Sequence, residues 1–349
     1  GRKQVMTPSP LKSWAIENKI KYLTPITLKK ETKVSLDKFS RSRIRSLATD
    51  FDPAENFCQA GFCNQRTVVQ TIKDLLVDVA VVIDYGLLIP TAVFNSPRFK
   101  TLNIHFSNLP KYRGPYPDSF VLLNGEKKTA ISCVCIDEGF DTGRVLAQKE
   151  VEVSDTETAG ELHQRLYAIT AEILPYIINS WAEWNMGTKV NQLTINNEQL
   201  TISLPPIKQD ESAATYTKML SRMDGFIEWK ILQKLLNKQP INPDELPDLI
   251  RNYSTNFQFS IFNFYRAVTP WPGIWTEIDF YNYSSNEVRS LQRKLLDCSH
   301  TASQVRTIKR LKILKAHLED NKFVIDEVQL EGKKPVSWKQ FLTSHKINP

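Results

Sequence analysis

The chain has 349 residues, of which 41% are hydrophobic, 24% charged and 10% aromatic, and its formal net charge is +7. Such values are typical of a globular protein with one large domain or two ordinary ones, and they exclude collagen, a long coiled coil and wholesale disorder. Basic residues outnumber acidic ones in residues 1–50 and 266–349, whereas the stretch between them is acidic. This distribution fits a protein that holds a polyanion at its flanks, and it is also typical of a solvated basic surface.

Neither a membrane span nor a metal site is expected from the residue pattern. No apolar run reaches the roughly 18 residues that a membrane-spanning helix needs. The five cysteines are scattered, without a CxxC pair or a zinc-ligand spacing. A disulfide framework and a zinc site are therefore not expected, and free thiols indicate a reducing compartment.

The first half of the chain alternates between predicted strands and helices. Residues 1–10 form a basic, proline-containing loop, and an amphipathic helix is predicted at residues 11–20. Apolar periodicity predicts another helix at residues 67–76. The β-branched run at residues 78–83 predicts a strand buried on both faces, followed by a turn at residues 85–90.

Three more strands are predicted at residues 101–106, 129–136 and 145–153. A long helix capped within residues 155–158 is predicted to follow and to run to about Trp181. Strands that alternate with helices indicate a Rossmann-like, doubly wound α/β domain over residues 1–185.

The second half of the chain differs in composition and in its predicted elements. Residues 186–211 are rich in Asn, Gln, Thr and Pro, which indicates a linker. Helices are predicted after it at residues 214–220 and 227–236. Short strand-like runs follow at residues 274–280, 305–316 and 323–330. Several short strands without long helices predict a small OB-like β-barrel within a second domain, residues 212–349.

Two segments carry the residue types of a reactive site. Residues 103–117 read NIHFSNLPKYRGPYP, and residues 137–143 read DEGFDTG. On a strand, Asn103 and His105 share one face, and ligands of open α/β sheets bind beyond the carboxyl ends of the strands. An amide, an imidazole and a carboxylate at neighbouring strand ends suit acyl-type transfer. Taken singly, a lone His is more often a core or surface residue, and an acidic loop is more often a plain turn.

Together these segments resemble the motifs of the formyltransferase family that uses 10-formyltetrahydrofolate. Within that family the resemblance is to methionyl-tRNA formyltransferases, through GRKQVMTPSPLK at the start, TPWPGIWTEI at residues 269–278 and EGKKPVSWKQFL at residues 331–342. The resemblance implies transfer of a formyl group from 10-formyltetrahydrofolate to the amino group of methionine on initiator methionyl-tRNA, for translation initiation, without a metal. The sequence departs from the family pattern at Asp84, Phe106 and Asn108.

The resemblance also implies roles for individual residues. Catalysis would rest on Asn103, His105 and Asp141, with the Asn103 amide and a protonated His105 stabilising the oxyanion and Asp141 holding His105 charged. The residues that would bind folate are Tyr85, Gly86, Leu87, Leu88, Ile89, Pro90, Ser107, Asn108, Leu109, Pro110, Asp137 and Glu138. Those that would contact tRNA are Arg2, Lys3, Lys309, Arg310 and Lys312.

Several properties stay open at this level. Family members place a strand, a turn, a helix and a second strand before the basic loop, so we expect this chain to lack the first β-α-β unit. Two other functions remain: an inactive or weakly active fragment that serves as an RNA-binding module, and a formyltransferase acting on a small amine. High Lys, Asn and Ile content and low Gly content favour an enzyme of the mitochondrial matrix, with a bacterial cytoplasm or plastid as alternatives. A monomer is also expected.

Overall fold

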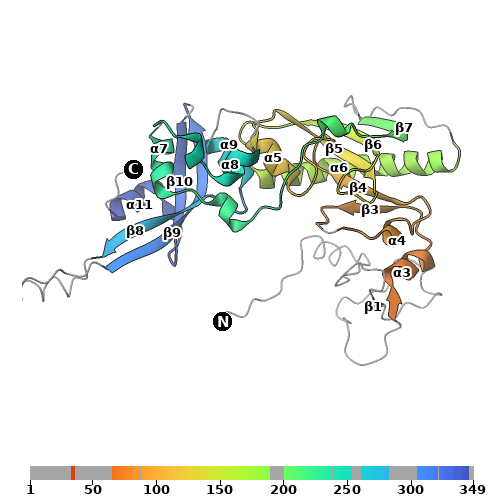
Figure 1. The fold of residues 1–349 in the computed structure, drawn as a ribbon, viewed down its shortest axis with the longest axis horizontal. Helices are drawn as coiled ribbons and strands as arrows, with labels where there is room; N and C mark the ends of the chain where they lie inside the picture. Colours follow the sequence, from red (N-terminus) through yellow and green to blue (C-terminus); the bar gives the residue numbers. More distant parts are fainter. Residues whose placement is uncertain are drawn as a thin grey trace, which may run out of the picture. The chain divides into compact units, whose positions relative to one another are not determined.

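The computed structural model describes residues 33–35, 65–86, 88–188, 200–237, 239–253, 261–282, 305–320 and 322–345. By compactness the chain divides into a first unit of residues 1–103, 135–143 and 178–190 and a second unit of residues 104–134, 144–177 and 191–349. Figure 1 shows the helices and strands of both units. The loop and helix predicted over residues 1–20, which include Arg2 and Lys3, lie outside the described residues.

A five-stranded sheet has the order β3-β4-β5-β6-β7. Its strands span Ala80–Ile83, Thr101–His105, Lys128–Cys135, Val145–Glu152 and Leu200–Ile207. Helix α4 (Thr91–Phe94) lies in the chain between β3 and β4, and helix α5 (Pro117–Leu123) between β4 and β5 (Figure 1). The last two pairs, β5 with β6 and β6 with β7, are antiparallel. The predicted strand–helix alternation is thus confirmed for the first part of the sheet.

The interior of this sheet follows from its apolar residues. Strands β4 and β5 are buried along most of their length, with Leu102 0% and Ile131 1% exposed. Helix α6 (Ala159–Asn185) presents buried leucines at Leu162 and Leu166, one helical turn apart. Of the residues 155–158 that were predicted to cap this helix, Thr158 is the one that does so. Its N–H and its hydroxyl both donate to the Glu161 carboxylate at 2.8 Å.

Three predictions about individual segments are corrected. Strand β3 is only partly buried because it is the edge strand of this sheet among the described residues. Residues 200–207, assigned from sequence to a linker, form strand β7 at the opposite edge, where the two prolines of the strand are tolerated. Residues 214–220 are extended rather than helical, because their backbone bonds to another loop instead of to itself.

Shorter elements complete the first unit and its surroundings. Strands β1 (Lys33–Ser35) and β2 (Gln65–Thr67) pair antiparallel, and helix α3 (Val68–Asp74) follows β2 and confirms the predicted helix.

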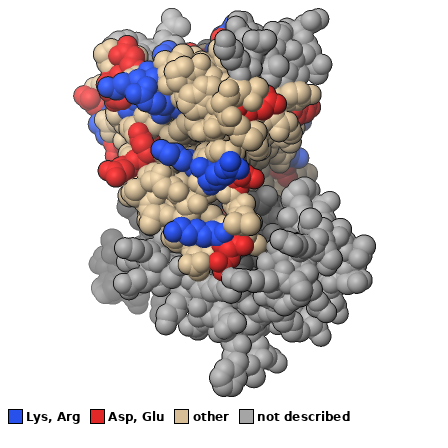
Figure 2. All heavy atoms as spheres, turned by 90° about the vertical axis from the view of Figure 1, so that its right-hand side faces the viewer, with Lys and Arg blue, Asp and Glu red and all other residues tan. Residues whose placement is uncertain are grey.

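Figure 2 shows one face of the molecule, on which the described Lys and Arg side chains lie among Asp and Glu side chains. On that face the described charges are therefore mixed rather than gathered by sign.

The C-terminal part contains a four-stranded antiparallel sheet in the order β11-β10-β9-β8. Its strands span Trp275–Asn282 (β8), Val305–Glu319 (β9), Lys322–Leu330 (β10) and Val336–Ser337 (β11). The helices of this part are α7 (Trp229–Leu236), α8 (Asp248–Tyr253), α9 (Ile261–Ala267) and α11 (Trp338–His345). The strands predicted for the barrel are confirmed as strands, and the described residues arrange them as this sheet.

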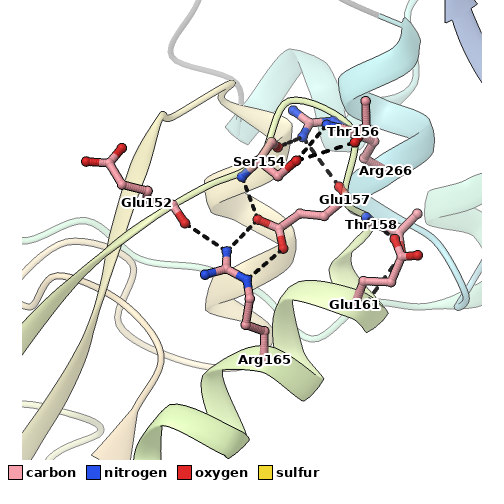
Figure 3. A network of polar contacts seen from close by, with 8 residues as sticks. All are labelled: Glu152, Ser154, Thr156, Glu157, Thr158, Glu161, Arg165 and Arg266. Carbon is pink, nitrogen blue, oxygen red and sulfur yellow. Dashed lines mark hydrogen bonds and ion pairs between the residues drawn. The ribbon is translucent and has the colours of Figure 1, made fainter.

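A polar network fixes the loop between β6 and α6 (Figure 3). Arg165 donates to the Glu157 carboxylate at 2.6 and 3.1 Å, and the Ser154 N–H donates to the same carboxylate at 2.6 Å. Arg266 on α9 donates to the Ser154 carbonyl at 2.7 Å and to Asn263 Oδ1 at 2.8 Å. Burial lowers the pKa of Arg266, against the opposing influence of nearby carboxylates. Helix α9 is thus bonded to the loop at the start of α6.

Candidate active site

An amide on strand β4 and a carboxylate of the loop after β5 meet within the first unit. Asn103 Nδ2 donates to Asp141 Oδ1 at 3.1 Å, and both side chains are half-buried. Asp141 has a φ of +56°, a left-handed conformation that Asp and Asn tolerate better than most residues. A Cβ added at Gly143 would lie 1.9 Å from the Cys135 carbonyl oxygen, so this turn closes only with glycine there. The turn residues therefore place Asp141 against Asn103.

The other carboxylates of this loop have different surroundings. Asp137 Oδ1 accepts from the Gly139 N–H at 3.1 Å and from the Thr142 hydroxyl at 2.6 Å. Its carboxylate therefore stabilises the loop itself, a role that the sequence pattern did not reveal. Glu138 is exposed. Binding of folate by Asp137 and Glu138 stays a prediction.

His105 ends strand β4 and belongs to the second unit. Its side chain is 6% exposed, and its Nε2 lies 2.8 Å from the Tyr112 carbonyl oxygen. The neighbouring Phe106 points to the opposite face of the strand, where its ring meets those of His163 and Tyr167 at 5.4 and 5.1 Å between centroids. The bulky side chain that departs from the family pattern is thus part of the core under α6.

The loop after β4 is tied to strand β5. Ser132 Oγ donates to the Ser107 carbonyl at 2.6 Å and accepts from the Leu109 N–H at 3.3 Å. Ser107 Oγ donates to the Lys111 carbonyl at 2.6 Å. Ser107 and Leu109 are buried, so these two predicted folate residues form the inner part of the loop.

Strand β6 supports the outer part of the same loop. Gln148 Nε2 lies 3.0 Å from the Leu109 carbonyl oxygen and 3.2 Å from Asn108 Oδ1. Asn108 is exposed, and the Leu109–Pro110 peptide is cis. Sequence reasoning missed Ser132 and Gln148, because nothing in a strand pattern distinguishes a serine or glutamine that will bond to a distant loop.

The turn after β3 presents apolar side chains within the first unit. Tyr85 is 42% exposed and Leu88 is 55% exposed, and Gly86 is exposed between them. Leu87 lies outside the described residues. Asp84, which departs from the family pattern, is exposed and has a φ of +55°, so it turns the chain out of the strand.

The end of this turn packs inward. Ile89 joins Val69 and Ile72 around the buried Val93, and Pro90 is the N-cap residue of α4. Ile89 thus contributes to the core of the first unit. Of the predicted folate residues in this turn, Tyr85 and Leu88 are the large apolar side chains that reach the surface.

The cations assigned to tRNA on the C-terminal sheet all lie on β9. Because side chains alternate along a strand, Arg310 and Lys312 share one face and Lys309 lies on the other. The Arg310 guanidinium lies 5.4 Å from the centre of the Trp275 ring. The three cations therefore do not form one surface cluster, although the sequence groups them.

The described residues offer neither a metal centre nor a membrane span. No group of three or more His, Cys, Asp or Glu side chains among them could hold a metal ion. None of the helices described is long and apolar enough to cross a membrane.

An amide that donates to a carboxylate on a Rossmann-like sheet, with an imidazole two residues further along the same strand, offers polar groups that acyl transfer can use. Residues 28–178 match the formyl transferase family model, and residues 255–346 match the model of the formyl transferase C-terminal domain. The chain belongs to the formyltransferase family, whose members transfer formyl groups.

The similar proteins include several methionyl-tRNA formyltransferases. A methionyl-tRNA formyltransferase from Alkaliphilus metalliredigens is 30% identical over 81% of this chain and 75% of its own length. One from Clostridium novyi is 25% identical over 99% of this chain and 86% of its own. Among solved structures, the methionyl-tRNA formyltransferase from Clostridium thermocellum has 17% identity and a TM-score of 0.43, covering 75% of this chain and 81% of that one.

Proposed function

We propose that this enzyme transfers a formyl group from 10-formyltetrahydrofolate to the amino group of methionine on initiator methionyl-tRNA, for translation initiation. The observation that carries the proposal is the hydrogen bond from Asn103, in the middle of β4, to Asp141 in the loop after β5. The choice of acceptor is supported by the names of the relatives and by the basic ends of the chain.

The proposed chemistry assigns one task to each polar group. The amino nitrogen of methionine attacks the formyl carbon and loses a proton to Asp141. The bond from that carbon to the folate nitrogen then breaks, and the folate nitrogen leaves with the electron pair and takes up that proton. Asn103 Nδ2 carries two hydrogens; one donates to Asp141, and the other stabilises negative charge on the formyl oxygen. His105 is the second donor to that oxygen. Asp141 orients the amide and accepts the amine proton.

The first unit offers residues that fit a folate. Its ring system is flat and largely apolar on its faces, and Tyr85 and Leu88 expose large apolar side chains after β3. They belong to the unit that also contains Asn103 and Asp141. Bound 10-formyltetrahydrofolate supplies the formyl group. These two side chains would hold it.

For cellular location we propose the mitochondrial matrix, supported by the Lys-, Asn- and Ile-rich, Gly-poor composition. Localisation of a tagged protein by microscopy tests this. A monomeric state likewise remains a prediction, for which light scattering is the direct measurement.

Single substitutions test the catalytic assignment. Asn103→Ala and His105→Ala should each lower formyl transfer to initiator methionyl-tRNA by roughly 10²–10³-fold, because each removes a donor to developing negative charge. Asn237→Ala and His345→Ala are matched controls, since each of these side chains lies at the end of a helix of the C-terminal part and bonds to a backbone carbonyl one turn earlier. Near-normal turnover in both the Asn103 and the His105 variant would contradict the catalytic roles assigned to these residues.

The same assay separates the alternatives. A formyltransferase for small amines would formylate a free amino sugar and ignore methionyl-tRNA. A silent RNA-binding module would bind tRNA in a filter assay and formylate neither acceptor. Initiator methionyl-tRNA formylated well above elongator methionyl-tRNA is the outcome that supports the proposal.

A further inference from the structure

The backbone of Tyr112 is held in a conformation that it would not adopt alone. Its φ is +59°, in the left-handed region, which is uncommon for a bulky residue and persists where surrounding contacts enforce it. Its carbonyl oxygen lies 2.8 Å from His105 Nε2. Whatever holds Tyr112 in this conformation therefore also fixes a hydrogen-bond partner of the imidazole.

The contacts come from residues 209–217, which we call the clasp. The Tyr112 N–H donates to Thr215 Oγ1 at 2.8 Å, and the Arg113 N–H donates to the Thr215 carbonyl at 2.8 Å. The Thr215 N–H donates in turn to the Pro110 carbonyl at 3.3 Å, and the Thr217 N–H to the Arg113 carbonyl at 2.8 Å. Thr215 thus bonds on both sides of the Tyr112 backbone, although it lies 103 residues further along the chain.

A buried cation locks the clasp in place. Arg113 is 0% exposed, and its guanidinium donates to both Glu211 carboxylate oxygens at 2.8 Å. It also donates to Gln209 Oε1 at 2.9 and 3.1 Å and to the Tyr216 hydroxyl at 3.1 Å. The Glu211 hydrogen bonds raise the pKa of Arg113, and the Arg113 guanidinium lowers the pKa of Glu211. A buried guanidinium needs these partners, because an unpaired buried charge is strongly unfavourable.

The side chain of Tyr112 has its own anchor. Its hydroxyl donates to Glu126 Oε1 at 2.9 Å, and the ring lines a pocket of about 270 Å³ together with Thr215 and Tyr216 of the clasp. Backbone and ring are therefore held from different directions. The loop has few ways to move without breaking several of these bonds together.

We propose that the clasp sets the position of His105, and that Thr215 and Glu211 are positioning residues for formyl transfer. Thr215 holds the Tyr112 backbone directly, and Glu211 acts through Arg113. This inference rests on the proposed function for its kinetic consequence, whereas the position of the imidazole can be measured without any substrate.

The test uses the full chain and four variants. Thr215→Val removes the hydroxyl that accepts from Tyr112, and Thr215→Ser keeps it. Glu211→Gln keeps the shape of the side chain and removes its charge. Glu245→Gln is the matched control, because Glu245 also pairs with a cation, Lys234 at 2.8 Å, but far from the clasp along the chain. Each variant is examined by NMR of the His105 ring nitrogens and by steady-state kinetics.

We expect Thr215→Val and Glu211→Gln to shift the His105 ring signals and to lower kcat by at least about 10-fold, with KM changed only a few-fold. Thr215→Ser and Glu245→Gln should keep the signals and the rate. If Thr215→Val does not fold, the comparison of the His105 signals and kcat between Glu211→Gln and Glu245→Gln tests the inference.

Unchanged His105 signals in Thr215→Val and Glu211→Gln would overturn the inference, and so would shifted signals with an unaltered kcat. Shifted signals in a protein whose wild type formylates no methionyl-tRNA would instead contradict the proposed function, while the role of the clasp in placing His105 would stand.

Discussion

Asp141 is a residue whose charge can be removed with little change in backbone strain. It has a φ of +56°, which Asn tolerates as well as Asp, so Asp141→Asn keeps shape and conformation. Because the variant cannot accept the amine proton as a carboxylate, we expect turnover to fall by roughly 10²–10⁴-fold. Affinity for tRNA should stay within a few-fold in a filter-binding measurement.

A matched control exists at Asp320, an exposed turn residue with a φ of +46°. Asp320→Asn makes the same chemical change in the same type of backbone and should leave turnover unchanged. Loss of tRNA binding by Asp141→Asn, with turnover of bound substrate preserved, would show that Asp141 is structural.

Residues of the site differ in how well sequence could predict them. Asn103 and Asp141 stand in recognisable motifs, and the structure joins them by a hydrogen bond. Arg113 stands in the same motif, in KYRGP, but its importance depends on Glu211, which is 98 residues away in sequence. A contact of that separation leaves no local pattern, so the clasp could not be predicted from residue spacing.

At the scale of elements, strands inside the sheet were the most predictable. Strands β4, β5 and β6 are mostly buried, and each begins and ends within one residue of its expected position. Strand β7 was missed because an edge strand admits proline and polar residues, which a sequence pattern interprets as a linker. Residues 214–217 of the clasp were predicted as part of a helix, and they are not helical because their stabilising bonds run to another segment.

The side chain of Arg266 attaches helix α9 to a loop outside it. Arg266 is 4% exposed and bonds to the loop between β6 and α6. Arg266→Met keeps the aliphatic stem but removes the guanidinium that donates to the Ser154 carbonyl and to Asn263. We expect the free energy of unfolding to fall by about 2–3 kcal/mol, measured by urea denaturation.

Arg98→Met is the control for this prediction. Arg98 is a surface residue, 67% exposed, whose pair with Asp78 spans 3.6 Å. Exposed pairs of this kind contribute at most about 1 kcal/mol. An Arg266 variant no less stable than the Arg98 variant would show that the Arg266 guanidinium does not stabilise the fold.

For the whole molecule, the faces of β9 predict which cations act together on tRNA. Arg310 and Lys312 share a face, so their double replacement by Ala should weaken binding of initiator and elongator tRNAs alike. Removing one phosphate-binding cation should flatten the slope of log K against log salt by about 0.7–0.9 between roughly 50 and 200 mM salt. Lys309→Ala, on the other face, should change the slope less.

Lys128→Ala controls for charge alone, because Lys128 pairs with Glu150 at 2.5 Å on the five-stranded sheet. If the double variant and this control gave the same affinity and slope, the tRNA contact would lie on another surface.

The position of β7 and the clasp has a consequence for recombination between relatives. Both come from residues 200–217, outside the two family-matched regions at 28–178 and 255–346. A chimaera joined at residue 185 would receive its edge strand and the partners of Arg113 from a foreign parent. The segment to exchange between relatives therefore extends through Thr217. A chimaera keeps the sheet, β7 and the clasp from one parent only when the crossover lies after that residue.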